Sequence, residues 1–201
     1  MASRLVGLMR VLEWTDYPHR NSPAPGAGVT AFAAQTATNI LSSGWGVQRV
    51  TGGVTMADTL EITVQFVRGN SWVENWAFSQ SAAYQSNLLT HERGHYQLAG
   101  LLARDAFLAF MRLKANVYTT SSSLQNDIRS VSAATLAKAQ ALDQKYEDDT
   151  THGQDATEQT AWNGYIQTAF SQPAVPAQTT PDSVVVKTPI LSVLAANSIR
   201  I

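Results

Sequence analysis

Leu88-Leu89-Thr90-His91-Glu92-Arg93-Gly94-His95-Tyr96 contains the pattern H-E-x-x-H, with His91, Glu92 and His95 at its specified positions. On a helix, residues four apart lie on the same face with their β-carbons about 5–6 Å apart. Both imidazoles can therefore reach one metal ion at about 2.0–2.1 Å. Glu92 would point into the same cleft, where it can take a proton from a water that the metal activates. The pattern is typical of zinc hydrolases and predicts His91 and His95 as ligands and Glu92 as the general base.

Composition narrows the classes of protein to which this chain can belong. Its 201 residues are 44% hydrophobic and 14% charged, which is enough apolar material for a sizeable core. The formal net charge is −1 and there is no run of Lys or Arg, so we expect no nucleic-acid partner. No apolar stretch is long enough to span a bilayer. The chain has no cysteine, so a zinc site here must use histidine and carboxylate ligands.

The amino terminus has no pattern of a secretory leader. Only five uncharged residues separate Arg4 from Arg10. This is too short for the apolar core of a signal peptide, so we expect none within this sequence.

The chain has two consecutive regions with different residue patterns. Residues 13–73 are rich in Val, Thr and aromatic residues between Gly, Pro and Ser, and residues 59–67 alternate between apolar and polar with a period of two. Residues 81–170 have the spacing of helices. We therefore expect an α+β fold, in which a small, mostly antiparallel N-terminal sheet packs on a zincin-like helical core with a central H-E-x-x-H helix.

The helical region divides into three predicted helices. The first carries the motif and is apolar on most sides through Met111, so we expect it to be buried. A second helix, capped by one of the serines 121–123, should run to about Tyr146. Asp155 followed by Glu158 resembles a capping box and predicts the start of a third.

The last part of the chain differs from the rest. Four prolines interrupt residues 172–189, which predicts an extended linker, and an apolar tail follows from Ile190. We expect a metallopeptidase-like domain over residues 1–171 and an appended linker and tail over residues 172–201. The tail would pack as an edge strand, stay without fixed structure, or fold back into the cleft as a pseudo-substrate.

A catalytic zinc ion requires a third protein ligand. Asp105 lies on nearly the right helix face, but about 15 Å beyond His95 along the axis, which is too far. His152 is the preferred candidate, because a returning antiparallel helix would bring it beside the motif. Glu147 and Asp148 are the next candidates for the third ligand.

Polar residues around such a metal would have supporting roles. A second donor is needed for the oxyanion that forms during hydrolysis, and Tyr146 is the candidate, with Tyr96 as an alternative more suited to packing. Acidic side chains can also hold a histidine ring in its metal-binding tautomer, a role open to Asp16, Glu147 and Asp148. His19, next to a proline, is expected at the surface.

Several stretches, in this order, resemble a bacterial family of predicted secreted zinc-dependent proteases, an H-E-x-x-H domain formerly of unknown function. They span roughly residues 12–170 and comprise residues 12–17, residues 88–96, residues 146–153, and Gln159 with Trp162. The resemblance implies a zinc peptidase with His91 and His95 as ligands and Glu92 as base. It also marks His152 as functional and suggests a secreted or periplasmic protein.

The expected function is hydrolysis of a protein or peptide substrate with one Zn²⁺ ion as cofactor, Glu92 acting as general base. The alternative is a non-catalytic module in which a closed metal site stabilises the fold for binding. Glu92 argues against that alternative, because a purely structural site has no use for a base beside its ligands.

Overall fold

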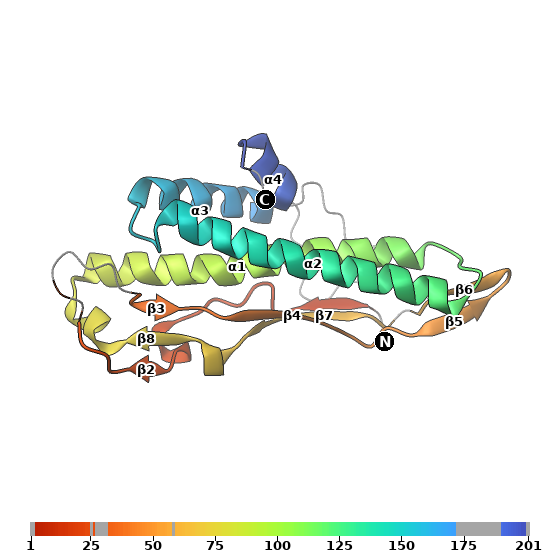
Figure 1. Ribbon diagram of the computed structural model, residues 1–201, viewed down its shortest axis with the longest axis horizontal. Helices are drawn as coiled ribbons and strands as arrows, with labels where there is room; N and C mark the ends of the chain where they lie inside the picture. Colours follow the sequence, from red (N-terminus) through yellow and green to blue (C-terminus); the bar gives the residue numbers. More distant parts are fainter. Residues whose placement is uncertain (1–2, 25, 27–31, 58, 172–189, 200–201) are drawn as a thin grey trace.

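A layer of long helices lies over a layer of short strands in the computed structural model of this protein (Figure 1). The structure describes residues 3–24, 26, 32–57, 59–171 and 190–199. Among these residues, all strands precede the four α-helices in the chain, as expected for an α+β fold.

Three small sheets form the strand layer of the described residues. In the first, β7 pairs in parallel with β1 and antiparallel with β4, and Thr38 lies opposite Phe66. In the second, β8 pairs in parallel with β2 and antiparallel with β3. The third is the antiparallel hairpin of β5 and β6. The bounds are β1 Arg4–Val6, β2 His19–Arg20, β3 Ala34–Gln35, β4 Thr38–Ser43, β5 Val47–Val50, β6 Gly53–Met56, β7 Glu61–Phe66 and β8 Trp72–Glu74.

The strand expected at residues 59–67 is β7, at the centre of the first sheet. Ile62, Val64 and Phe66 are buried, while the residues between them are less so, because successive side chains point to opposite faces of a strand. Antiparallel pairs outnumber parallel ones, as predicted, but they are divided among three sheets rather than joined in one.

The longest helix, α1 (Ala82–Lys114), carries the H-E-x-x-H residues. It begins where the hydroxyl of Ser81 accepts a hydrogen bond from the Tyr84 N–H, and 16 of its residues are buried. About half of the helix is thus buried, and the buried residues all lie between Leu88 and Phe110.

Two further helices return over α1. α2 (Ser121–Thr150) runs antiparallel to α1 (Figure 1) and begins one residue earlier than expected, because the hydroxyl of Thr120 accepts the Ser123 N–H. α3 (Ala156–Ser171) starts as predicted, with the Asp155 carboxylate accepting the Thr157 and Glu158 N–H groups. The remaining short helices are η1 Trp14–Asp16, η2 Arg68–Asn70, η3 Asn75–Ser79 and α4 Ile190–Ala196.

In the described part of the C-terminal tail, residues 190–199, α4 joins the helical core and no edge strand is present. The side chains of Ile190 and Leu194 in α4 are fully buried among apolar residues of α1, α2 and α3. The Ile190 N–H also donates to the Asp105 carboxylate at 3.1 Å. The expectation that this tail occupies the cleft is therefore wrong for residues 190–199, because their apolar side chains complete a core cluster instead. The linker expected at residues 172–189 lies outside the described residues.

Among the described residues, no helix combines the length and apolar character needed to cross a membrane.

Candidate metal centre

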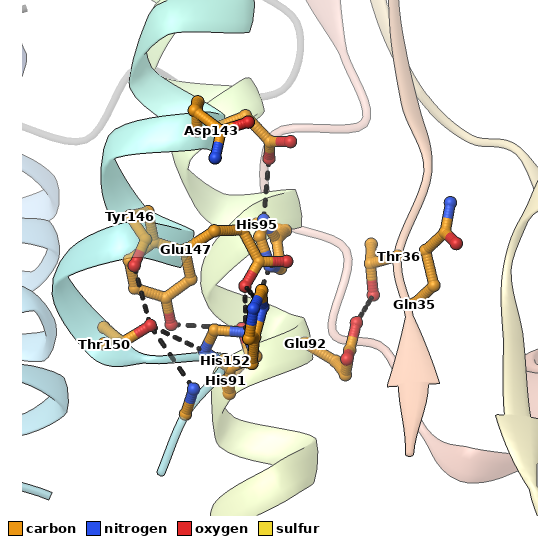
Figure 2. Close-up of polar contacts among 12 residues, drawn as sticks. Gln35, Thr36, His91, Glu92, His95, Asp143, Tyr146, Glu147, Thr150 and His152 are labelled. Atoms are coloured by element: carbon orange, nitrogen blue, oxygen red, sulfur yellow. Dashed lines mark hydrogen bonds and ion pairs between the residues drawn. The ribbon is translucent and has the colours of Figure 1, made fainter. Parts of the chain in front are cut away.

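The imidazoles of His91 and His95 converge with the carboxylate of Glu147 between α1 and α2 (Figure 2). The two Nε2 atoms are 3.2 Å apart. Glu147 Oε2 lies 3.3 Å from His91 Nε2, and Glu147 Oε1 lies 3.2 Å from His95 Nε2. One ligand atom from each residue can be chosen so that all lie within 4.8 Å of one another. This group could hold a metal ion.

The close approach of two helices makes this convergence possible. Gly94, between the two histidines, faces Tyr146 on α2, and a β-carbon added to it would lie 2.1 Å from the Tyr146 hydroxyl. Only a glycine permits that separation, and it brings Glu147, the next residue on α2, within reach of both rings. The predicted i, i+4 pairing of His91 and His95 on one helix face is present.

Hydrogen bonds to Nδ1 fix the orientation of both rings. His91 Nδ1 lies 3.0 Å from Gln159 Oε1, and His95 Nδ1 lies 2.7 Å from Asp143 Oδ1. Both oxygens can only accept, so each Nδ1 must carry a hydrogen. In the neutral rings, the lone pair is then on Nε2, facing Glu147. This is the tautomer that a metal ligand requires.

The charges in the cluster are strongly coupled. Burial alone would lower the pKa of His95, but hydrogen bonds to Asp143 and Glu147 outweigh it and raise the pKa to about 10. Burial would raise the pKa of Glu147, but its hydrogen bonds to His91 and His95 hold that pKa well below its usual range. Glu147 is thus an anion that attracts a cation, either a proton on a ring or a metal ion.

Glu92 lies beside the cluster and points toward the strand layer (Figure 2). Its Oε2 accepts a 2.6 Å hydrogen bond from the Thr36 hydroxyl. Since that hydroxyl has one hydrogen, Tyr17 must donate its own at 2.7 Å to Thr36. Burial raises the pKa of Glu92, against the opposing influence of His95 and His91. The carboxylate predicted to be a base is therefore held from one side by a buried chain of hydroxyls.

His152, the preferred third ligand from the sequence, is not part of this group of three but contacts Glu147. Its Nδ1 is 2.7 Å from Glu147 Oε2. The cause is local, because α2 ends at Thr150 and the chain then turns through left-handed residues, with φ of 49° at Thr151 and 54° at His152. Glu147, still inside the helix, occupies the place next to the rings. Glu147, the second choice for the third ligand, is thus the residue that the structure brings into the cluster.

Asp148, the other second choice for the third ligand, accepts a hydrogen bond from Gln144 at 2.8 Å on the exposed side of α2. Residues 147 and 148 are about 100° apart around a helix, so only one can face α1. Asp16 pairs with Arg10 at 2.7 Å within the N-terminal segment and touches no residue of the cluster. His19 is exposed, as expected.

Tyr146 is fully buried, and its ring stacks on that of His91. Its hydroxyl donates to the His91 carbonyl at 3.1 Å and accepts from Gln159 Nε2 at 2.8 Å. These bonds occupy the hydroxyl that was expected to stabilise an oxyanion. Tyr96 is also engaged in packing, since its hydroxyl donates to the Gly7 carbonyl at 2.9 Å.

Two residues with clear roles around the cluster were not predicted. Asp143 lies four residues before Glu147 on α2, the same spacing as the two histidines, and this signal in the sequence could have revealed it. Thr36 comes from the segment between β3 and β4, and nothing in the sequence near it points to Glu92.

The chain has matches at the level of a family but not of individual proteins. No curated protein and no solved structure matches it. A family model matches residues 10–153, which include the metal cluster, Glu92 and His152 but not α3, whose Gln159 orients His91. The protein therefore belongs to the family described as "Bacterial protein of unknown function (DUF922)".

Proposed function

We propose that this protein is a zinc-dependent peptidase with a zincin-like helical core, in which His91, His95 and Glu147 hold one ion and Glu92 is the general base. The observation that carries the proposal is the convergence of two Nε2 atoms and one carboxylate on a single point, with a buried carboxylate beside them.

The donor set fits zinc in a catalytic site. Two imidazoles and one carboxylate are the ligands of known zinc peptidases, and three protein ligands leave a fourth position for water or substrate. Both Nδ1 atoms already have acceptors, so the rings need no rearrangement to present Nε2. The anionic Glu147 reduces the net charge of a bound dication.

A zinc ion held by His91, His95 and Glu147 would supply Lewis acidity, which makes a water more acidic and polarises a peptide carbonyl. Glu92 would take a proton from the attacking water and later deliver it to the leaving amine. Because Thr36 holds Oε2, we assign the transferred proton to Oε1. His152 keeps Glu147 oriented through the bond between Nδ1 and Oε2.

The contact between His152 and Glu147 is the observation that favours a second candidate function. In that function, four protein ligands close the metal site, and the ion stabilises a binding module. The two functions differ in access to the ion. A hydroxamate should bind the zinc-loaded protein if one position is open, and should not bind if His152 closes the site.

The decisive experiment compares Glu92→Gln with Glu158→Gln, which changes an exposed glutamate on α3. Glu92→Gln should retain one zinc per chain, while kcat/KM on an unstructured casein substrate falls by about 10²–10⁴-fold. Glu158→Gln should match the parent in both measurements. His91→Ala should lose both zinc and activity. Parental rates for Glu92→Gln, or a parent protein that takes up no zinc, would overturn the proposal.

A further inference from the structure

A long groove leads away from the metal cluster between α1, α2 and β4. Its volume is about 460 Å³, and His95 and Asp143 form one end of it. The α1 residues that line it recur every three or four positions, so they form one face of the helix. They are His95, Leu98, Ala99, Leu102, Ala106 and Phe110. Thr38, Asn39, Ile40 and Ser42 of β4 line its opposite side.

Uncharged side chains form nearly all of the lining of this groove. Apart from His95 and Asp143 at the metal end, none of the described residues that line it is charged. Four alanines, Ala37, Ala99, Ala106 and Ala139, leave space for side chains that enter it. Leu136 lies at its edge with 61% of its surface exposed, an unusual position for a large apolar residue unless it has a partner.

A second, smaller cavity lies on the other side of the cluster. Its volume is about 240 Å³, and its lining includes His91, Glu92 and Glu147 together with the apolar Phe32 and Leu88. The segment of residues 32–42 lines both cavities, because residues 32–34 border the smaller one and residues 35–40 and 42 border the groove. The metal cluster therefore lies between the two cavities, and the segment of residues 32–42 runs from one cavity to the other.

From this arrangement we infer that the groove binds an extended, uncharged segment of a polypeptide substrate on one side of the cleaved bond, so that the protein is an endopeptidase. The inference rests on the proposed function, since it takes the metal cluster as the point of cleavage. Continuity with that cluster identifies the occupant, because His95 belongs to both the cluster and the groove, and Asp143, which bonds to His95 Nδ1, also lines the groove.

The dimensions of the groove set the length of the segment. From His95 to Phe110 it follows α1 for about 22 Å, at 1.5 Å per residue. An extended chain covers that distance with about six residues. Recognition of a free chain terminus would need a charged partner, and none is present among the described lining residues beyond the metal cluster and its immediate contacts. An internal segment fits both cavities better than a terminus.

The test uses random decapeptides with acetylated and amidated ends, in two measurements on the zinc-loaded full chain. Cleavage products of the parent are sequenced by mass spectrometry, and peptides retained by immobilised Glu92→Gln are identified in the same way. Ala139→Trp is introduced to fill the groove, with Ala137→Trp as the matched control on an exposed position of α2. Leu136→Glu places a charge at the edge of the groove, with Ala134→Glu as its exposed control.

We expect internal cleavage and a run of uncharged residues on one side of the cut. Ala139→Trp should lower cleavage and retention by about tenfold. Leu136→Glu should enrich Lys and Arg at one position of that run by about tenfold, because a negative charge at the edge favours a basic partner. The two control variants should behave like their parent in both measurements.

The outcomes separate this inference from the proposed function. If the parent cleaves but the groove variants select the same peptides as their controls, the groove does not bind substrate and the inference fails, while the peptidase stands. If nothing is cleaved but retention depends on the groove variants, the groove binds peptides and the proposed catalysis fails. Absence of both cleavage and retention, or cleavage only of peptides with free ends, overturns the inference.

Discussion

The ring of His91 lies nearly parallel to the ring of Tyr146, with 4.8 Å between the centroids and 14° between the planes. The hydroxyl of the same tyrosine donates to the carbonyl of the same histidine. Tyr146 thus holds both the side chain and the backbone of a candidate ligand, and Gln159 joins the two by bonding to both. The residue that the sequence suggested as an oxyanion donor is better described as a support for His91.

Tyr146→Phe should therefore weaken zinc binding rather than selectively slow catalysis. In this variant, the Gln159 amide and the His91 carbonyl each lose a buried hydrogen-bond partner. This loss should lower the free energy of unfolding by about 1–3 kcal/mol. We expect zinc affinity, measured by chelator competition, to fall by at most about 10–100-fold. At saturating zinc, kcat should change by much less than the roughly 10²–10³-fold expected for loss of an oxyanion donor.

Tyr96→Phe is the control for this prediction. It also removes a hydroxyl that donates to a backbone carbonyl in the core, that of Gly7. Its unfolding free energy should fall by a similar amount, with unchanged zinc affinity. Equal zinc affinities in the two variants would show that Tyr146 does not support the site.

Glu147→Gln and His152→Ala should differ in zinc affinity. If Glu147 is the third ligand, its neutralisation removes both a ligand and the negative charge that balances the ion. If His152 only orients Glu147, its loss should cost about 10–100-fold, as is usual for an outer partner, and Glu147→Gln should cost clearly more. Chelator competition measures both, with Asp148→Asn as control because Asp148 bonds only to Gln144 in the described structure. The reverse order of effects would restore His152 as the ligand.

Gly94→Ala should destabilise the protein and disturb the metal site together. The added β-carbon would lie 2.1 Å from the Tyr146 hydroxyl, so α1 and α2 must separate. Overpacking of this kind costs about 1–3 kcal/mol, and the movement takes Glu147 away from the histidines. Urea unfolding and zinc titration provide the two measurements.

Gly164→Ala offers the opposite expectation in another helix. Gly164 lies inside α3, and a β-carbon there would meet nothing within 4 Å. Alanine should stabilise this helix by about 0.5–1 kcal/mol and leave zinc binding unchanged. A Gly94→Ala variant as stable as the parent would contradict the close helix contact.

The docking of α4 should depend on pH through Asp105. Burial raises the pKa of Asp105 from its ordinary value of 3.8 to about 6, although Arg104, the Ile190 N–H and Lys138 oppose this shift. The folded protein therefore binds this proton more tightly than the unfolded chain. The stabilisation is complete below about pH 4 and is lost as the pH rises through about 6, a change of up to roughly 3 kcal/mol.

Asp105→Asn isolates this contribution, because asparagine still offers an oxygen to the Ile190 N–H but cannot ionise. In urea unfolding between pH 4 and 7, the parent should lose stability relative to the variant as the pH rises. A difference between the two proteins that stays constant across this range would exclude Asp105 as the titrating group.

The candidate site was only partly predictable from the sequence. His91, Glu92 and His95 follow from one helical turn, because the 3.6-residue period alone places two of them on one face. The third position of the cluster depends on how α2 returns over α1. That path is set by Gly94, which lets the helices approach, and by the left-handed residues after Thr150, which carry His152 past the rings.

The same distinction applies to the fold. Periodicity along the chain was enough to predict β7 at residues 61–66, the buried α1 and the start of α3 at Asp155, since each pattern is local. It could not predict that the strands divide into three sheets, that Thr36 meets Glu92, or that α4 packs on α1 and α3. Those contacts join residues far apart in the chain, and their energies depend on which surfaces remain to be buried once the local elements have formed. The sequence by itself determined the chemistry available, and the tertiary structure decided which carboxylate stands beside the two histidines.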